Sequence, residues 1–282
     1  MSSRLASFVL GLFCAGFPIN LPAGSIPPVR PPQLRSAAFL VQDQRTGEVL
    51  LTKRAEISMP IASITKLMTA MVVLDARLDM NASVAVEESD RDTLRYSHSR
   101  LPVGTRLSRR EALLLSLMAS ENRAAHALGR TFPGGIEVLV KAMNEKARAL
   151  GLADTKFDDP TGLSDKNVSS ARDLGALVNA ACGYPEISAF STTPETTVQI
   201  GRRRLSFINT DALVRNPRWH IGLSKTGYLD DAGRCLVMQT QLARRPILIV
   251  LLNSVGKNTR LADANRIKRW MEASNSLEKG RP

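Results

Sequence analysis

A serine and a lysine stand three residues apart at the start of a long apolar run, as Ser63-x-x-Lys66. Residues three apart share a helix face, so the two side chains meet if a helix begins near Ala62. Pro60, with its fixed φ and no backbone N–H, suits the entrance of such a helix. A serine hydroxyl needs a nearby base, and a neutral lysine amine is one. The pair alone is weak evidence, because such a serine usually caps the helix and such a lysine is usually solvated.

Two further polar triads follow downstream, an S-x-N at 120–122 and a K-T-G at 225–227. The first stands where a buried helix over 112–118 is expected to end, so its side chains would project into a cleft. The simpler interpretation is that Ser120 caps the following helix. The second triad lies on a strand expected over 220–226. The order S-x-x-K, S-x-N, K-T-G is that of serine enzymes acylated by penicillin and by D-alanyl peptides.

Together these motifs resemble those of the low-molecular-weight penicillin-binding proteins, most closely the D-alanyl-D-alanine endopeptidases of the penicillin-binding-protein-seven type. The resemblance extends over residues 37–273. Besides the triads, it rests on KLMTAMVVLDA at 66–76, SENRAA at 120–125, PTGLS at 160–164 and SARDL at 170–174. It implies a serine peptidase that hydrolyses peptide cross-links in peptidoglycan through an acyl-enzyme, is inhibited by β-lactam antibiotics and needs no cofactor.

The chemistry of these motifs assigns Ser63 as the acylating nucleophile and Lys66 as its general base. Lys66 can act only if its amine is largely neutral. We expect burial, the nearby cation Lys225 and the positive end of the helix to lower its pKa. Ser120 would relay a proton to the leaving amine, and Asn122 would bind the peptide backbone of the substrate.

The K-T-G strand is expected to form the other wall of the site. Lys225 and the Thr226 hydroxyl would hold a carboxylate of the substrate or of penicillin. Gly227 has no side chain, which lets a substrate strand lie close to the sheet edge. The oxyanion hole would consist of the nucleophile's own N–H and, by the resemblance, that of Tyr228. The resemblance also places Arg260 near the carboxylate pocket, although a surface arginine at the start of a helix is the simpler interpretation.

The formal net charge of +12 raises the question of a nucleic acid partner. The basic residues are dispersed, however, and cluster only at 202–204 and 244–245, both expected to be hairpin loops, while 5% of residues are aromatic. An anionic polymer such as peptidoglycan with free carboxylates fits the charge better, and simple solubility fits it equally well. We therefore expect no nucleic acid partner.

Neither the histidines nor the cysteines form a metal-binding pattern. His98, His126 and His220 are scattered and there is no C-x-x-C, so no metal is expected. Beyond residue 23 the cysteines are Cys182 and Cys235. They form either one disulfide bond or two buried thiols.

Residues 1–23 have the pattern of a secretory signal peptide, because Arg4 precedes an apolar segment too short to span a bilayer. An uncleaved membrane anchor is the alternative. A proline-rich linker over 24–36 leads to the catalytic domain over 37–273 and a polar tail over 274–282. We therefore expect a periplasmic protein that lacks the C-terminal β domain and amphipathic anchor of related carboxypeptidases.

The hydrophobic period places strands at both ends of the chain and helices between them. Strands are expected over 37–42, 48–52, 196–200, 205–208, 220–226, 233–242 and 247–253, and helices from about 62 and over 112–118, 122–129, 136–150, 174–181 and 260–273. Capping-box spacing at Ser108–Glu111 and Ser170–Asp173 marks two helix starts. The pattern predicts an α+β fold, with one antiparallel sheet from both termini and an all-helical lobe, as in the β-lactamases and DD-peptidases.

Three other functions share this serine chemistry. The motifs do not separate an endopeptidase from a D-alanyl-D-alanine carboxypeptidase. A β-lactamase needs a group that activates water for deacylation, which in class A enzymes is a glutamate; the loop over 158–165 has aspartates, which could substitute, but no glutamate. A non-catalytic β-lactam sensor would become acylated without turnover.

Overall fold

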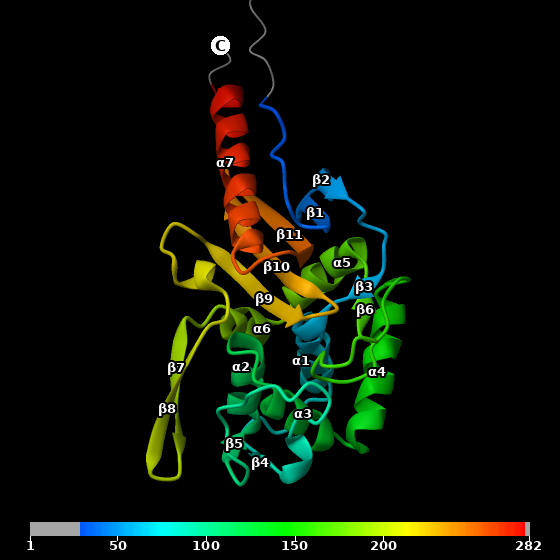
Figure 1. Ribbon diagram of the computed structural model, residues 1–282, viewed down its shortest axis with the longest axis vertical. Coiled ribbons are helices and arrows are strands. Elements are labelled where there is room, and N and C mark those ends of the chain that lie inside the picture. Colours follow the sequence, from blue (N-terminus) through cyan, green and yellow to red (C-terminus); the bar gives the residue numbers. More distant parts are fainter. Residues whose placement is uncertain (1–28, 280–282) are drawn as a thin grey trace, which may run out of the picture.

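A five-stranded antiparallel sheet joins the two ends of the chain (Figure 1). The structure, a computed structural model, describes residues 29–279, so the expected signal peptide lies outside the described residues. The strands, in the sheet order β2-β1-β11-β10-β9, are β2 (Val49–Lys53), β1 (Ala38–Asp43), β11 (Arg245–Ser254), β10 (Gly233–Leu242) and β9 (Ile221–Leu229). The predicted pairing of the first hairpin with the last strands is confirmed.

The sheet is buried on both faces because its central strands are apolar at nearly every position. Leu40 and Val250 pack towards the helical lobe, whereas Val41 and Ile249 pack beneath the C-terminal helix α7 (Thr259–Lys279). Burial of each such side chain contributes about 1.5–3 kcal/mol. α7 extends to Lys279, past the predicted end, so part of the expected tail is helical.

The helical lobe lies on the other side of the sheet (Figure 1). Its helices are α1 (Lys66–Asp75), α2 (Arg109–Met118), α3 (Asn122–Arg130), α4 (Gly135–Ala149), α5 (Ala171–Ala181) and α6 (Pro185–Ser191). α1 is buried from Lys66 to Val73, as its apolar sequence predicts. The capping box at Ser108 is confirmed. Ser170 caps α5, but the Asp173 carboxylate accepts hydrogen bonds from Asp154 and Thr155 instead of closing the box.

Short elements that sequence periodicity did not predict connect these parts. They are the strand pairs β3 (Met59–Pro60) with β6 (Val168–Ser169) and β4 (Ser83–Ala85) with β5 (Arg106–Ser108), and the 3-10 turns η1 (Ala62–Thr65), η2 (Glu88–Asp90) and η3 (Ala212–Arg215). Pro60 ends strand β3, and two residues later the chain turns helical at Ala62, where the helix was expected to begin, and enters α1 through η1. The predicted hairpin of β7 (Glu195–Ile200) and β8 (Arg203–Ile208) is confirmed.

The described end of the expected linker is held against α7. The backbone N–H groups of Arg35 and Ser36 both donate to Asp263 Oδ2, at 2.9 and 2.8 Å. The Ser36 hydroxyl is buried and also donates to this carboxylate. Trp270 donates its indole N–H to the carbonyl of Val29. The described part of this segment is therefore packed against α7.

The alternatives left open for the cysteines are now decided, because Cys182 and Cys235 are both free thiols. In the described part of the chain, no group of three or more histidine, cysteine, aspartate or glutamate side chains could hold a metal ion. Within residues 29–279, no helix is both long and apolar enough to cross a membrane.

Candidate active site

The Ser63 hydroxyl and the Lys66 amine meet at the junction of η1 and α1. Lys66 Nζ donates to Ser63 Oγ at 2.8 Å. Ala62, which precedes the serine, has a φ of +49°, a left-handed conformation that costs a non-glycine residue about 1 kcal/mol. The turn brings the serine backbone beside strand β9, which ends the sheet on this side. The geometry that the S-x-x-K spacing predicts is therefore present.

Lys66 is fully buried, and its amine makes two further contacts that tie it to distant segments. It donates to Asn122 Oδ1 at 2.8 Å and to the carbonyl of Thr161 at 2.5 Å. Burial lowers the pKa of Lys66 to about 7, while the carboxylates of Asp159, Glu121 and others oppose that shift. A large neutral fraction of the amine is therefore available near neutral pH.

Lys225 is the second buried cation of the site. Its pKa is lowered well below its usual range by burial, and repulsion from Lys66 and Arg260 adds to this. The expected lowering of the Lys66 pKa by burial is present, whereas the repulsion between the two amines acts on the pKa of Lys225. Lys225 Nζ donates to Ser120 Oγ at 2.9 Å, so the K-T-G strand and the S-x-N motif touch across the site.

The S-x-N motif occupies a tight connection between α2 and α3. Ser120 has a φ of +57°, another left-handed residue at the site. The capping interpretation of Ser120 is wrong, because the residue before α3 is Glu121 and the Ser120 hydroxyl faces Lys225. Asn122 accepts from Lys66 and donates to Ser97 Oγ at 2.8 Å. The three motifs therefore converge on one place.

Strand β9 runs directly past Ser63. A Cβ on Gly227 would lie 2.8 Å from the carbonyl oxygen of Ile61 and 3.2 Å from the backbone nitrogen of Ser63. Only glycine allows this approach, which brings the backbone that follows Gly227 close to the serine. The Tyr228 side chain is half exposed and its hydroxyl donates to Asp230 at 2.6 Å. Any role of Tyr228 in an oxyanion hole belongs to its backbone.

Arg260 is buried, which overturns its interpretation as a surface residue at the start of α7. Its side chain is only 9% exposed, and within the described chain Nε and Nη1 have no hydrogen-bond partner. Burial lowers its pKa, and its charge acts on Lys225. A buried guanidinium with free donors is costly in isolation, so this arrangement suits an anionic group that binds there.

Several residues of the site escaped the sequence analysis. Thr210 Oγ1 lies 2.7 Å from Thr226 Oγ1 and is exposed at the end of the β7–β8 hairpin. Ser99 donates to the buried Glu121 carboxylate, and burial raises the pKa of Glu121. No local motif marks Thr210 or Ser99, because only the fold brings them to the three triads.

Asp159 organises the loop that carries Thr161. Its two carboxylate oxygens accept hydrogen bonds from the backbone N–H groups of Thr161, Gly162 and Ser164 and from the Asn167 amide. These hydrogen bonds lower the pKa of Asp159 despite its burial. The turn-forming sequence of this loop was the available signal. Because both oxygens are occupied, Asp159 is a structural residue that holds the Thr161 carbonyl against Lys66.

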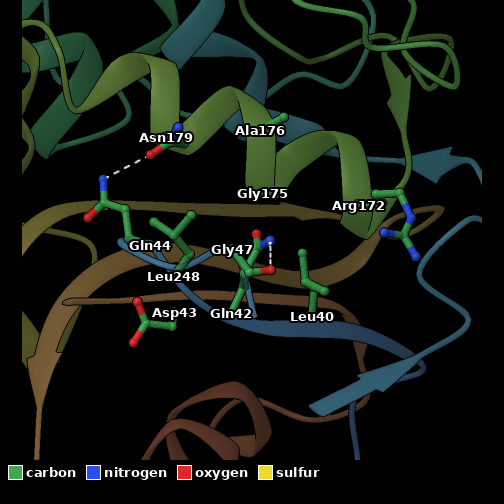
Figure 2. Close-up of a pocket in the computed structure, with 10 residues that line it drawn as sticks. All are labelled: Leu40, Gln42, Asp43, Gln44, Gly47, Arg172, Gly175, Ala176, Asn179 and Leu248. Carbon is green, nitrogen blue, oxygen red and sulfur yellow. Dashed lines mark hydrogen bonds between the residues drawn. The ribbon is translucent and has the colours of Figure 1, made fainter. Parts of the chain in front are cut away.

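A separate pocket of about 260 Å³ lies between α5 and the sheet, lined by Leu40, Gln42, Asp43, Gln44, Gly47, Arg172, Gly175, Ala176, Asn179 and Leu248 (Figure 2). Its amide side chains satisfy one another or the backbone. Gln44 donates to Asn179 at 3.1 Å, and Gln42 donates to the Gly47 carbonyl at 2.8 Å. The pocket shares no residue with the Ser63 site and offers no nucleophile.

This fold and this site together define a serine hydrolase of the penicillin-recognising class. The chain belongs to the D-alanyl-D-alanine carboxypeptidase family, peptidase S11, whose sequence profile matches residues 27–256. It is therefore a serine-type DD-peptidase.

Named relatives and solved structures agree with this membership. The chain is 49% identical over 242 residues to a D-alanyl-D-alanine endopeptidase of Pseudomonas aeruginosa, which covers 85% of this chain and 78% of the relative. It is 44% identical to one of Escherichia coli over 86% of this chain and 78% of the relative. The crystal structure of the Streptomyces K15 DD-transpeptidase superposes with a TM-score of 0.81 at 26% identity, over 87% of this chain and all of that one.

Proposed function

We propose that this DD-peptidase is an endopeptidase that hydrolyses the D-alanyl cross-links of peptidoglycan in the periplasm. The observation that carries the chemistry is the 2.8 Å contact between the Lys66 amine and the Ser63 hydroxyl, with the amine fully buried. The endopeptidase name of the two relatives at 49% and 44% identity supports the choice of substrate.

In the acylation step, Ser63 Oγ attacks the carbonyl carbon of the D-alanyl residue while Lys66 Nζ accepts the hydroxyl proton. The carbonyl oxygen becomes negatively charged and is stabilised by the backbone N–H groups of Ser63 and Tyr228. Each such donor is worth about 3 kcal/mol in the transition state. The tetrahedral intermediate then collapses, and the bond between the carbonyl carbon and the leaving nitrogen breaks.

The leaving amine needs a proton, and Ser120 would pass one on. Its hydroxyl contacts the Lys225 amine at 2.9 Å on the side of the site that faces the sheet. The proton that Lys66 accepted would reach the amine through this hydroxyl. Water then attacks the acyl-enzyme, Lys66 accepts a proton from that water, and Ser63 is released with its proton restored.

Substrate carboxylates would bind where the buried cations have unused donors. Arg260 has two unpaired nitrogens, and Thr226 and Thr210 present adjacent hydroxyls. Lys225 adds a third source of donors at the same wall. Asn122, which now bridges Lys66 and Ser97, would exchange one of these contacts for the peptide backbone of the substrate. The carboxylate of a penicillin would occupy the same place.

The alternatives differ in turnover and in substrate. A β-lactamase would need a free carboxylate near the acyl bond, whereas Asp159 has both oxygens occupied by its own loop. That argues for a long-lived penicillin adduct. A carboxypeptidase has the same triads, and relatives that bear this name are at about 30% identity or below.

The test incubates the protein with labelled penicillin and with cross-linked muropeptide dimers. We expect a stable adduct and cleavage of the dimers to monomers. Rapid loss of the adduct would indicate a β-lactamase, release of terminal D-alanine without dimer cleavage a carboxypeptidase, and an adduct with no peptide cleavage a sensor. Ser63→Ala should abolish both labelling and cleavage while the fold is retained, whereas Ser58→Ala, on the surface, should abolish neither.

A further inference from the structure

The β7–β8 hairpin projects from the side of the helical lobe (Figure 1). Its strands pair from Glu195 opposite Ile208 to Ile200 opposite Arg203. Val198 and Phe207, on one face, are only 3% and 2% exposed and join the main hydrophobic core. The hairpin is therefore a fixed part of the fold, and its other face remains in solvent.

Arg100 anchors the hairpin to the loop beside the active site. Its guanidinium donates to the carbonyl of Ser206 at 2.5 Å and lies 5.1 Å from the centre of the Phe207 ring. Ser99, its neighbour in the chain, contacts Glu121 of the S-x-N motif. The hairpin and the S-x-N motif are therefore connected through the adjacent residues Ser99 and Arg100.

Three consecutive arginines, Arg202, Arg203 and Arg204, form the tip of the hairpin. All three are exposed, and none has a carboxylate within salt-bridge distance among the described side chains. The one acidic residue of the hairpin, Glu195, stands at the opposite end. The tip therefore concentrates three uncompensated positive charges on one projection, whereas other arginines of this chain, such as Arg130 and Arg245, are paired.

The chain that leaves the hairpin leads directly to the K-T-G motif. Strand β8 ends at Ile208, two residues before Thr210, whose hydroxyl lies 2.7 Å from that of Thr226 in the K-T-G motif. Thr210 lies six positions after Arg204, and an extended chain rises about 3.3 Å per residue, so the charged tip lies at most roughly 20 Å from Thr210. A polymer bound at the tip could therefore present a neighbouring peptide to Ser63.

We propose that the arginine-tipped hairpin is a docking surface for the free carboxylates of peptidoglycan stem peptides, which holds the enzyme on the intact polymer. The proposal rests on the proposed function for its choice of polymer. The planar fork of arginine matches a carboxylate in bidentate geometry. A nucleic acid is disfavoured, because Phe207, the single aromatic residue of this described hairpin, is buried and cannot stack on bases.

The test measures co-sedimentation of the full-length protein with purified sacculi over a range of salt concentrations. The variant is R202Q/R203Q/R204Q, and the matched control is R54Q/R148Q/R269Q, which removes three exposed arginines from separate elements. We expect the tip variant to bind about tenfold more weakly at low salt, with the difference fading at high salt. The control should bind nearly as the wild type does.

A second binding measurement uses sacculi whose carboxylates have been chemically amidated. Amidation should weaken binding of the wild type to the level of the tip variant and leave the tip variant almost unaffected. Equal losses in the two triple variants would overturn the proposal, since they would reflect net charge alone. Wild-type binding that is insensitive to amidation would also overturn it, and a nucleic acid or another polyanion would then be the better ligand.

Activity on soluble substrates distinguishes a failure of the hairpin proposal from a failure of the proposed function. Both triple variants should react with labelled penicillin and cleave muropeptide dimers at the wild-type rate, because no residue of the three motifs or their contacts changes. Slower cleavage of intact sacculi by the tip variant alone is the expected consequence of weaker docking. If the wild type fails to cleave dimers, the endopeptidase assignment fails, while the binding comparison still tests the hairpin.

Discussion

Gly162 lies so close to Ala62 that a Cβ on the glycine would be 2.0 Å from the alanine carbonyl oxygen. Both residues have positive φ, +81° for Gly162 and +49° for Ala62. Two separate loops therefore interlock behind the nucleophile, each in a conformation that the other supports. Through this contact and the hydrogen bond from Lys66 to the Thr161 carbonyl, the 158–167 loop helps to fix the positions of Ser63 and Lys66.

Gly162→Ala should slow acylation of the protein by penicillin, whereas an alanine at a glycine away from the site should not. The added methyl collides with the backbone before Ser63, so we expect the penicillin acylation rate to fall by at least tenfold. Gly47→Ala is the matched control, because Gly47 has a φ of +77° but open space around its Cβ. It should cost about 1 kcal/mol in free energy of unfolding and leave acylation unchanged. Equal acylation rates in the two variants would contradict the proposed interlock.

The rate of acylation should depend on pH through the Lys66 amine. Burial lowers the pKa of Lys66 to about 7, and only the neutral amine accepts the serine proton. The second-order rate constant with penicillin should therefore rise as the pH increases through about 7 and level off above it. Stopped-flow labelling between pH 5 and 9 measures this. A flat profile, or a rate that falls over this range, would argue against a lysine base.

Glu121→Gln should move that profile to lower pH. The negative charge of Glu121 favours the protonated form of Lys66, so its removal lowers the lysine pKa further. Glutamine retains an oxygen that can accept the Ser99 hydrogen bond, so the loop should stay in place. Glu88→Gln, at an exposed glutamate paired with Arg91, serves as the control and should leave the profile unmoved. A shift to higher pH on Glu121→Gln would refute this electrostatic account.

Arg260→Gln should weaken the binding of substrates that carry a free carboxylate. We expect KM for a D-alanyl-D-alanine peptide to rise about tenfold, in line with the loss of a charged hydrogen bond. The C-terminal amide of the same peptide should be bound equally by wild type and variant. The free energy of unfolding should not fall, because the guanidinium is buried without a protein partner at two nitrogens. A KM increase that is equal for acid and amide would indicate a general disturbance of the pocket.

Local patterns in the chain were sufficient to predict most of the elements around the site. The alternation of apolar residues gave β10 its bounds, and the capping box at Ser108 marked the start of α2. The fixed φ of Pro60 suits both the end of strand β3 and the entrance to the helical segment that begins at Ala62, and only the strand was missed. The extension of α7 to Lys279 was missed because residues 274–279, with a single apolar residue, carry no hydrophobic period.

The sequence by itself determined which residues could perform the chemistry, because the S-x-x-K spacing places serine and lysine on one turn. Only the tertiary structure decided whether Lys66 can be neutral near pH 7, because its pKa depends on burial by segments distant in the chain. The same holds for Arg260, buried with unused donors, and for Cys182 and Cys235, which remain apart as thiols. Periodicity and motifs are local, whereas desolvation and long-range contacts arise only when the sheet and the helical lobe pack together.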